Sequence, residues 1–536
     1  MKKLVLSAAV AFFATASAMA QSNVDNSTQS GNGHQGTTTQ TGSANNNLLN
    51  QLGNGQISSV KQNGSANKAT TDQSGSANKS TVEQDGSTNT ADTTQSGANH
   101  NSKVDQDGSN NTAIALQTGN GNMSNVKQNG SGNNATTTQD GDNDSTLEQL
   151  GIGNIAAINQ TGENTSDAKQ DGTGNLAMVT QSGVGNDSDL VQDGNGNKAT
   201  ILQQDGFRAL DNNASVAEQN GNDNILSVQQ LGTGGNTSDV LQRGDENKTK
   251  IVQNSTNTAE VTQRGNGNEV DSYQFGTNTV EINQRGNDNY AKEYARGANN
   301  STTINQLFGN SNIANVRHTG SGPASTGNNN DVTVTQSFGN NNEAGIVQFG
   351  SDNTVAVTQS VGNRNYAKAD QTGDMHNATI EQMFGSRNNA DIDQTGNNHT
   401  AGVTQIGSDN NAKIEQRGHV SNLSNSTNNT GSIAQTGNEN IASLLQVGSN
   451  NSGGFAQVGT LNTIDAFQNG NFNTASADQI GSDNNLNLVQ TGAWNKATNT
   501  QIGIENSANI YQASSGHSHV GTQFGTGNTL TVTQSN

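Results

Sequence analysis

Hydrophobic and polar positions alternate along almost the whole chain with a period of two residues. Around residue 70, for example, Asn67, Ala69, Thr71 and Gln73 occupy every second position, with polar or charged residues between them. Successive side chains of a β-strand point to opposite faces, so the pattern predicts strands of about seven residues. Gly follows two residues after most of the glutamines, where a positive φ is expected, and predicts a tight turn after each strand.

The same unit recurs at an interval of eleven residues. Glutamine marks it at positions 40, 51, 62, 73, 84, 95, 106, 117, 128 and 139, after which the interval varies between ten and twelve. About 44 such units lie between Gln40 and the C-terminus, and a short period of this kind is typical of solenoids. A strand and a turn within eleven residues leave no room for a helix.

Units that lie two apart resemble each other more than neighbours do. The inward residue two positions before glutamine is Val60, Val82 and Val104 in one series, and Thr71, Thr93 and Ala115 in the other. Apolar content therefore repeats every 22 residues, which places two strands in each turn of the structure. The predicted fold class is all-β, a parallel β-solenoid with two strands per rung and about 22 rungs of about 22 residues.

Stacking equivalent residues on one another predicts ladders of buried amides. Each Gln or Asn would donate to its counterpart one rung away, at a spacing of about 4.8 Å. These bonds satisfy polar groups that would each cost roughly 1–3 kcal/mol if buried without a partner. The predicted ladder residues are Gln62, Gln73, Gln84, Gln95, Gln106, Asn67, Asn78, Asn89, Gln490 and Gln501.

The N-terminus differs from the repeats. Residues 1–20 have the features of a secretory signal peptide, namely Lys2 and Lys3, a short apolar run and an Ala-Met-Ala cleavage site that ends at Ala20. Residues 21–39 match the repeat poorly and are expected to be flexible. The repeat domain is assigned to residues 40–536.

Three insertions interrupt the repeats and are predicted to form loops at the corners of rungs. They lie between Gln204 and Gln219, between His318 and Gln336, and between Gln416 and Gln435. The second insertion contains the one proline of the chain, Pro323, which cannot donate to a ladder.

Composition then narrows the class of protein. Hydrophobic residues make up 28% and aromatic residues 3% of the 536 residues, which is too little for a large apolar core. The absence of cysteine excludes a disulfide scaffold and thiolate metal sites. The formal net charge of −21 becomes −23 when Lys2 and Lys3 leave with the signal peptide, and this excess argues against nucleic-acid binding.

Candidate chemistry is sparse. Ser, His and Asp occur without a nucleophile elbow or an apolar pocket, so we expect no enzyme activity, no cofactor and no catalytic residues. His517 and His519 could form a weak metal site on one strand face, but a solvated turn is the favoured interpretation and no metal site is predicted. Arg243, Arg264 and Arg285 recur every 21 residues and should stack on one edge. Their like charges are either offset by nearby carboxylates or form an anion-binding stripe.

The tandem unit N-x-A-x-x-x-Q-x-G-x-x-N behind a signal peptide resembles the curlin repeat of bacterial curli subunits, and it covers about residues 40–536. The resemblance implies a functional amyloid fibre of the biofilm matrix, serving cell aggregation and surface adhesion outside a Gram-negative-type bacterium. It implies as partners further copies of the chain, a curli-type outer-membrane secretion channel with accessory proteins, and a nucleator subunit. The chain departs from the family in having several times more repeats.

Two alternatives stand beside a major fibre subunit. A minor nucleator is disfavoured because the last unit, residues 528–534, has no charge, whereas the family's nucleating partner ends in a positively charged repeat. A monomeric ice- or carbohydrate-binding solenoid is suggested by Thr94, Thr138 and Thr180 on one edge, although Leu116 and Asn159 interrupt that row.

The last unit also predicts where a fibre would grow. Edge strands of soluble proteins are usually protected by charge, proline, a bulge or a covering element. Residues 528–534 have no charge and no proline, so Leu530, Val532 and Gln534 are predicted to form the growing edge.

Overall fold

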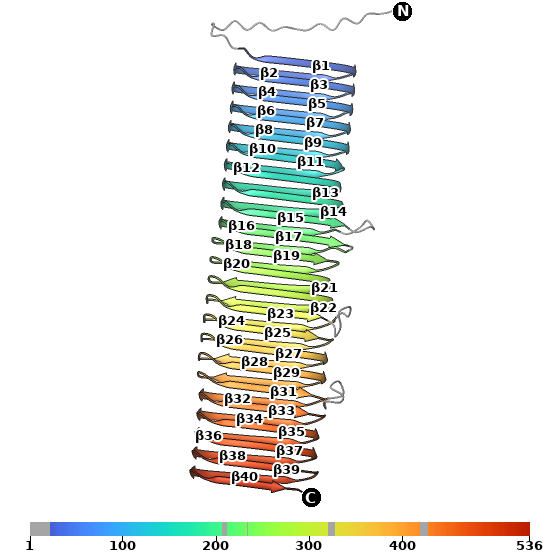
Figure 1. The fold of residues 1–536 in the computed structure, drawn as a ribbon. Coiled ribbons are helices and arrows are strands. Elements are labelled where there is room, and N and C mark those ends of the chain that lie inside the picture. The colour runs from blue at the N-terminus through green and yellow to red at the C-terminus, as the bar shows by residue number, and fades with distance from the viewer. Residues whose placement is uncertain (1–21, 206–211, 233, 320–326, 419–426, 536) are drawn as a thin grey trace, which may run out of the picture. The chain divides into compact units, whose positions relative to one another are not determined.

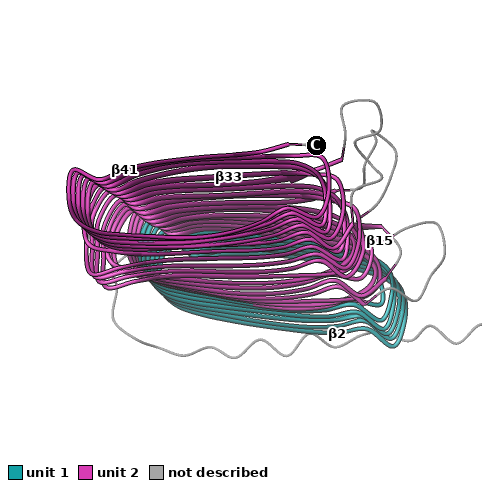
Figure 2. Cartoon of the chain, turned by 90° about the horizontal axis from the view of Figure 1, so that it is seen from below, with its two compact units in different colours: residues 1–142, 147–153 teal, residues 143–146, 154–536 magenta. Residues whose placement is uncertain are grey.

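The computed structural model describes residues 22–205, 212–232, 234–319, 327–418 and 427–535. Within these residues the chain forms 41 strands and no helix (Figure 1), and it divides into two compact units (Figure 2). Unit 1 comprises the chain up to Asp142 together with Leu147–Gly153, and unit 2 comprises Asn143–Thr146 and the chain from Asn154 onward. None of the described residues belongs to a helix that could cross a membrane. The predicted signal peptide, residues 1–20, lies outside the described residues.

Unit 1 consists of β1 (Val24–Asn32), β2 (Gln35–Ser43), β3 (Asn46–Asn54), β4 (Ile57–Ser65), β5 (Lys68–Ser76), β6 (Lys79–Ser87), β7 (Thr90–Ala98), β8 (Asn101–Ser109), β9 (Thr112–Asn120), β10 (Met123–Ser131) and β11 (Asn134–Gly141). Strand β12 (Asp144–Ile152) has its first three residues in unit 2 and the others in unit 1.

The first part of unit 2 consists of β13 (Ile155–Thr173), β14 (Leu176–Asn195), β15 (Lys198–Asp205), β16 (Ala214–Asn222), β17 (Ile225–Gly232), β18 (Thr237–Arg243), β19 (Lys248–Asn254), β20 (Thr258–Arg264), β21 (Glu269–Arg285), β22 (Tyr290–Leu307), β23 (Ile313–Thr319), β24 (Asp331–Ser337), β25 (Glu343–Phe349), β26 (Thr354–Ser360) and β27 (Tyr366–Asp374). Four of these strands, β13, β14, β21 and β22, are 17 to 20 residues long and each runs through two half-turns.

The second part of unit 2 consists of β28 (Asn377–Met383), β29 (Asn389–Asn397), β30 (Thr400–Ile406), β31 (Asn411–Arg417), β32 (Thr430–Asn438), β33 (Ile441–Val447), β34 (Ser452–Thr460), β35 (Thr463–Asn471), β36 (Thr474–Ser482), β37 (Asn485–Ala493), β38 (Lys496–Ile504), β39 (Ser507–Ala513), β40 (Ser518–Thr526) and β41 (Thr529–Gln534).

Each half-turn pairs in parallel with the half-turn one full turn later. Strand β4 pairs with β6 from Ile57↔Lys79 to Ser65↔Ser87, an offset of 22 residues. Equivalent glutamines therefore meet, as Gln62 does Gln84. The described strands make about 22 such turns, so the predicted fold class, an all-β parallel β-solenoid with two strands per turn, is confirmed.

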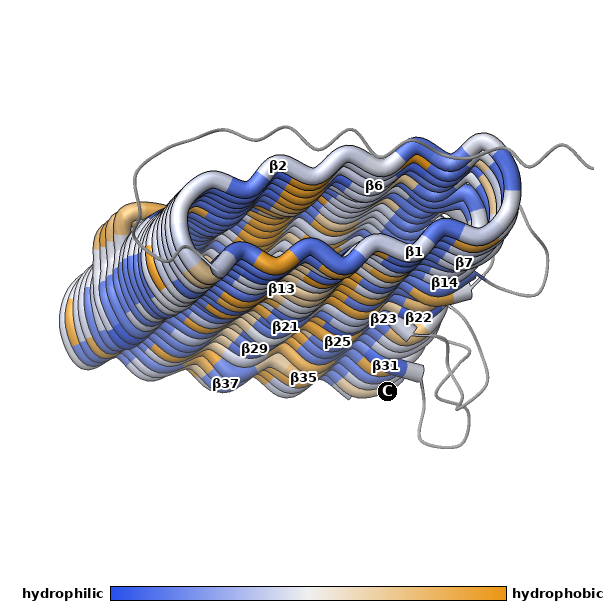
Figure 3. Tube along the Cα trace, turned by 90° about the horizontal axis from the view of Figure 1, so that it is seen from above, coloured by the Kyte–Doolittle hydropathy of each residue, from blue (hydrophilic) through white to orange (hydrophobic). Residues whose placement is uncertain are grey.

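The core is a thin layer between the two strands of each turn. Val60, Val82 and Val104 are at most 1% exposed, and Thr71 and Thr93 of the other strand series are fully buried. Outward positions alternate with these and are polar in most turns. Residues of like hydropathy follow one another from turn to turn as stripes, which Figure 3 shows within each unit.

The repeat begins earlier than the sequence analysis placed it. Residues 21–39 are predicted to be flexible, but β1 and the first part of β2 lie in this segment, and β1 pairs with β3 in the same register, with Gln29 opposite Gln51. The β1 segment differs from the repeat motif because Asp25 and Ser27 occupy the inward positions that are Ala and Val in many other units. The spacing of Gln29 and Gly31 was the available signal.

The insertions leave the pairing intact. Gln192 pairs with Gln219 and Gln203 pairs with Gln230, so the register resumes after an offset of 27 residues. Around the second and third insertions the offset becomes 30 residues, as in Gln306↔Gln336 and Gln405↔Gln435. The centres of the three predicted loops, including Pro323, lie outside the described residues.

Candidate functional site

The buried glutamines form hydrogen-bonded columns along each unit. In unit 1, the Nε2 of Gln62 donates to the Oε1 of Gln84 at 2.8 Å, and Gln84 donates to Gln106 at the same distance. Gln73 donates to Gln95 at 2.8 Å in the other column. In unit 2, Gln490 donates to Gln512 at 2.9 Å and Gln501 donates to Gln523 at 2.8 Å. The structure thus places every predicted ladder glutamine in a column.

Each predicted ladder glutamine also donates its second N–H, to a backbone carbonyl oxygen. Gln84 Nε2 lies 2.9 Å from the carbonyl oxygen of Lys68, on the facing strand of the solenoid. Gln62 makes the equivalent bond to the carbonyl oxygen of Asn46 at 3.1 Å. One side chain therefore links successive turns and also joins the two strands of a turn, which explains how so polar an interior is stabilised.

The predicted asparagines act differently from the glutamines. The Nδ2 of Asn67 donates to the carbonyl oxygens of Asn63 and Gly86, both at 3.1 Å, and its Oδ1 accepts the backbone N–H of Asn89 at 3.1 Å. Asn78 and Asn89 repeat this arrangement. Asparagine thus closes the turns through backbone groups, whereas the sequence analysis expected direct amide-to-amide bonds. Direct bonds between asparagines occur further along, as from Asn268 to Asn247 at 3.0 Å.

The glycine two residues after glutamine is required by close backbone approach. Gly86 has a φ of 115°, and a Cβ atom there would lie 1.9 Å from the carbonyl oxygen of Gly108 in the next turn. The sequence predicted a positive φ at this glycine, but it did not predict the second position of positive φ in each turn. Non-glycine residues such as Ala66 and Thr88 adopt φ near 57° just before the buried asparagine.

One glutamine column is interrupted in unit 2. Gln253 donates to Gln274 at 2.9 Å, the next two positions are Ala295 and His318, and the column resumes where Gln348 donates to Gln371 at 2.9 Å. His318 is fully buried, with Nε2 at 2.7 Å from the hydroxyl of Thr302. Burial lowers the pKa of His318 to about 4.

A buried carboxyl group lies beside this interruption. Glu293 occupies an inward position that is apolar in most turns, is fully buried, and accepts a hydrogen bond from the Ser272 hydroxyl at 2.8 Å. Burial raises the pKa of Glu293 to about 8. The sequence signal was a charged residue two positions before the place of the missing glutamine.

Three other histidines replace the buried asparagine of the repeat. His100, His376 and His399 are at most 1% exposed, and the rings of His376 and His399 stack with centroids 5.1 Å apart. Burial and then the neighbouring His376 lower the pKa of His399 to about 4. The repeat has Asn at this position, so the motif alone did not predict a buried histidine there.

The three arginines that recur every 21 residues stack on one edge, as predicted. Arg243 lies opposite Arg264, and Arg264 lies opposite Arg285, on successive turns. Arg243 contacts Glu218 at 3.5 Å, and the guanidinium of Arg285 lies 4.2 Å from the centre of the Phe308 ring. A carboxylate and an aromatic ring therefore contact two of the three stacked arginines.

The two histidines near the C-terminus have separate surroundings. The ring of His517 bonds to the carbonyl oxygen of Ala513 at 2.6 Å. Burial lowers the pKa of His519. Among the described residues there is no group of three or more His, Cys, Asp or Glu side chains that could hold a metal ion.

The C-terminal strand has an open inward face. In β41, Leu530 lies opposite Ala508, Val532 opposite Ile510 and Gln534 opposite Gln512, and each of the three is partly exposed. Gln534 accepts from Gln512 at 2.7 Å and donates to the carbonyl oxygen of Ser518 at 3.0 Å. No described residue accepts its other N–H.

The N-terminal end of the columns has the opposite polarity. Gln29 donates to Gln51 at 2.6 Å and Gln40 donates to Gln62 at 2.8 Å. No described residue donates to the Oε1 of either Gln29 or Gln40. The first turn of unit 1 therefore offers acceptors, and the last turn of unit 2 offers a donor.

Stacked glutamine columns and glycine-closed turns define a parallel β-solenoid whose strands repeat one sequence motif. Six segments match the family described as the curlin associated repeat, namely residues 59–86, 103–130, 163–194, 327–360, 385–418 and 459–492. These matches, spread along the chain, support its assignment to the curlin-repeat family. No curated protein matches it.

Proposed function

We propose that this protein is a secreted, non-enzymatic subunit of a curli-type extracellular fibre. The proposal includes export through a curli-type outer-membrane channel with accessory proteins. It also includes a role in the biofilm matrix, in cell aggregation and in surface adhesion. The curlin repeats support the family part of the proposal. The observation that carries the assembly part is that the first and last described strands, β1 and β41, are each paired along one edge only within the described residues.

The two ends are chemically complementary. The last turn offers the free N–H of Gln534 and the partly exposed Leu530 and Val532, and the first turn offers the free Oε1 atoms of Gln29 and Gln40. A second copy that docks its first turn on β41 would extend both the backbone ladder and the glutamine columns. Strand addition of this kind uses main-chain hydrogen bonds for affinity.

The experiment introduces charge at the C-terminal edge. Leu530→Lys with Val532→Lys places two ammonium groups where a docked turn would bury them, at a desolvation cost of several kcal/mol per ion. We expect monomers or short assemblies by electron microscopy over time. The matched control is Thr531→Lys with Thr533→Lys, because these neighbours point outward on the same strand and are exposed. Equal fibre growth by both double variants would refute growth through this edge.

A further inference from the structure

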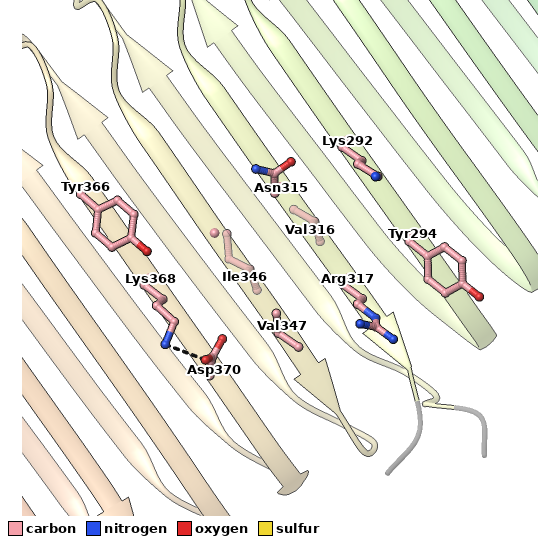
Figure 4. A pocket seen from close by; sticks show the side chains of 11 residues that line it. Lys292, Tyr294, Asn315, Val316, Arg317, Ile346, Val347, Tyr366, Lys368 and Asp370 are labelled. Atoms are coloured by element: carbon pink, nitrogen blue, oxygen red, sulfur yellow. Dashed lines mark ion pairs between the residues drawn. The ribbon is translucent and has the colours of Figure 1, made fainter. Parts of the chain in front are cut away.

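The outer face of four strands in unit 2 carries a cavity of about 360 Å³. It lies across β22, β23, β25 and β27, and Figure 4 shows Lys292 and Tyr294 on one side and Tyr366, Lys368 and Asp370 on the other. This volume is in the range of small-molecule sites. Two of these strands, β22 and β23, lack the ladder glutamine on their inward face, at Ala295 and His318, so the repeat is altered on both faces of these two strands.

A glycine creates the hollow. Gly345 is on the outward face of β25, between Asn315 and Lys368 in the register of the sheet. A Cβ atom at this position would meet no atom within 4 Å, and its backbone needs no left-handed φ. The glycine is therefore not required by the fold, in contrast to the turn glycines. It exposes a strip of bare backbone with longer side chains on either side.

The lining is positively charged in a chain of net charge −21. Three cations, Lys292, Arg317 and Lys368, face one carboxylate, Asp370. Lys368 contacts Asp370 at 2.7 Å and Asp391 at 3.6 Å. Among the described residues, Lys292 and Arg317 have no carboxylate within ion-pair distance. An anionic ligand would therefore find two cations that are not already neutralised.

Arg317 is held in position by aromatic rings. Its guanidinium lies 5.9 Å from the centre of the Tyr294 ring and 5.5 Å from that of Phe349. Cation–π contacts of this kind orient the planar group while leaving its N–H groups available. An arginine fork pairs with a carboxylate through two parallel hydrogen bonds.

We infer that this cavity binds a uronic acid unit of an acidic polysaccharide. The sugar ring would lie over the backbone at Gly345, between Tyr294 and Tyr366. Its carboxylate would pair with Arg317 and Lys292, and its hydroxyl groups would bond to Asn315 and Asp370. The lining side chains are spread over the face of four strands (Figure 4), so a polymer would continue along this face beyond the bound unit. The inference does not depend on fibre growth.

The test measures binding of tetragalacturonate to the full chain by calorimetry. We expect Gly345→Ile, which fills the hollow with a strand-favouring side chain, to raise Kd at least about tenfold. The control Gly402→Ile should bind as the unaltered chain does. Gly402 is also an outward strand glycine with open space around its Cβ position, but it lies on β30, outside the cavity.

A second pair of variants tests the charge. Arg317→Gln should also weaken binding at least about tenfold, because a hydrogen bond to a charged group is lost, whereas Arg264→Gln removes the same charge outside the cavity and should have no effect. The methyl-esterified tetrasaccharide should bind at least about tenfold more weakly than the acid. Unchanged affinity in Gly345→Ile or Arg317→Gln, equal affinity for acid and ester, or no binding by the unaltered chain would each overturn the inference.

Discussion

Replacing Glu293 by glutamine should remove the loss of stability that unit 2 undergoes around this residue as the pH rises. The carboxyl group is fully buried, and burial raises its pKa from 4.5 to about 8. Glutamine has nearly the same size and retains an oxygen that can accept the bond from Ser272, which is 2.8 Å long in the structure. The substitution therefore changes the ionisation and little else.

The sign and size follow from proton linkage. Between pH 4.5 and pH 8 the folded chain holds a proton on Glu293 that the unfolded chain releases, so the free energy of unfolding falls as pH rises through this window. From pH 6.5 to pH 8 the loss is about 1.6 kcal/mol, because the slope of roughly 1.4 kcal/mol per pH unit falls to half as Glu293 of the folded chain becomes half ionised near pH 8. His318 has the opposite effect, since its pKa is lowered to about 4 and its contribution is lost as pH falls from 6.5. The window above pH 6.5 therefore isolates Glu293.

Hydrogen exchange is the suitable assay because a solenoid opens locally rather than in one step. Protection of the amides of β21–β23, corrected for intrinsic rates, should fall about 15-fold from pH 6.5 to pH 8 in the unaltered chain and remain constant in Glu293→Gln. The control is Glu260→Gln, an exposed glutamate of β20. The same pH dependence in Glu293→Gln and the unaltered chain would refute the argument.

Two further predictions concern the ladders and the length of the turn. Gln84→Leu should leave Gln62 without its acceptor at 2.8 Å and should slow assembly. The outward Glu83→Ser should have little effect. Equal assembly rates of the two variants by light scattering would contradict the role of the glutamine column. Deleting residues 61–82 removes one full turn and should preserve the circular dichroism and melting of the chain. Deleting residues 62–72 places every later strand against the wrong one of the two strand series and should lower the melting temperature. Equal melting temperatures of both deletion variants would contradict the 22-residue turn.

The sequence alone determined the strand, the turn and the number of strands per turn. These are local properties: a two-residue alternation specifies a strand with two faces, and the glutamine-to-glycine spacing specifies the turn. The 22-residue segregation of Val60 and Val82 from Thr71 and Thr93 was enough to assign two strands to each turn. The glutamine columns followed because identical residues at a constant interval must meet when the turns stack.

The tertiary structure alone showed which residues occupy repeat positions without matching the motif, and which groups they contact. The buried His399 and the interruption at Ala295 and His318 could not be identified from the motif, because each departs from it, and β1 keeps only the spacing of Gln29 and Gly31. The cavity at Gly345 depends on side chains from four strands between residues 290 and 374, separated in sequence by an insertion. Only pairing across the turns, which is set by the stacked backbone rather than by neighbouring residues, brings those groups to one surface.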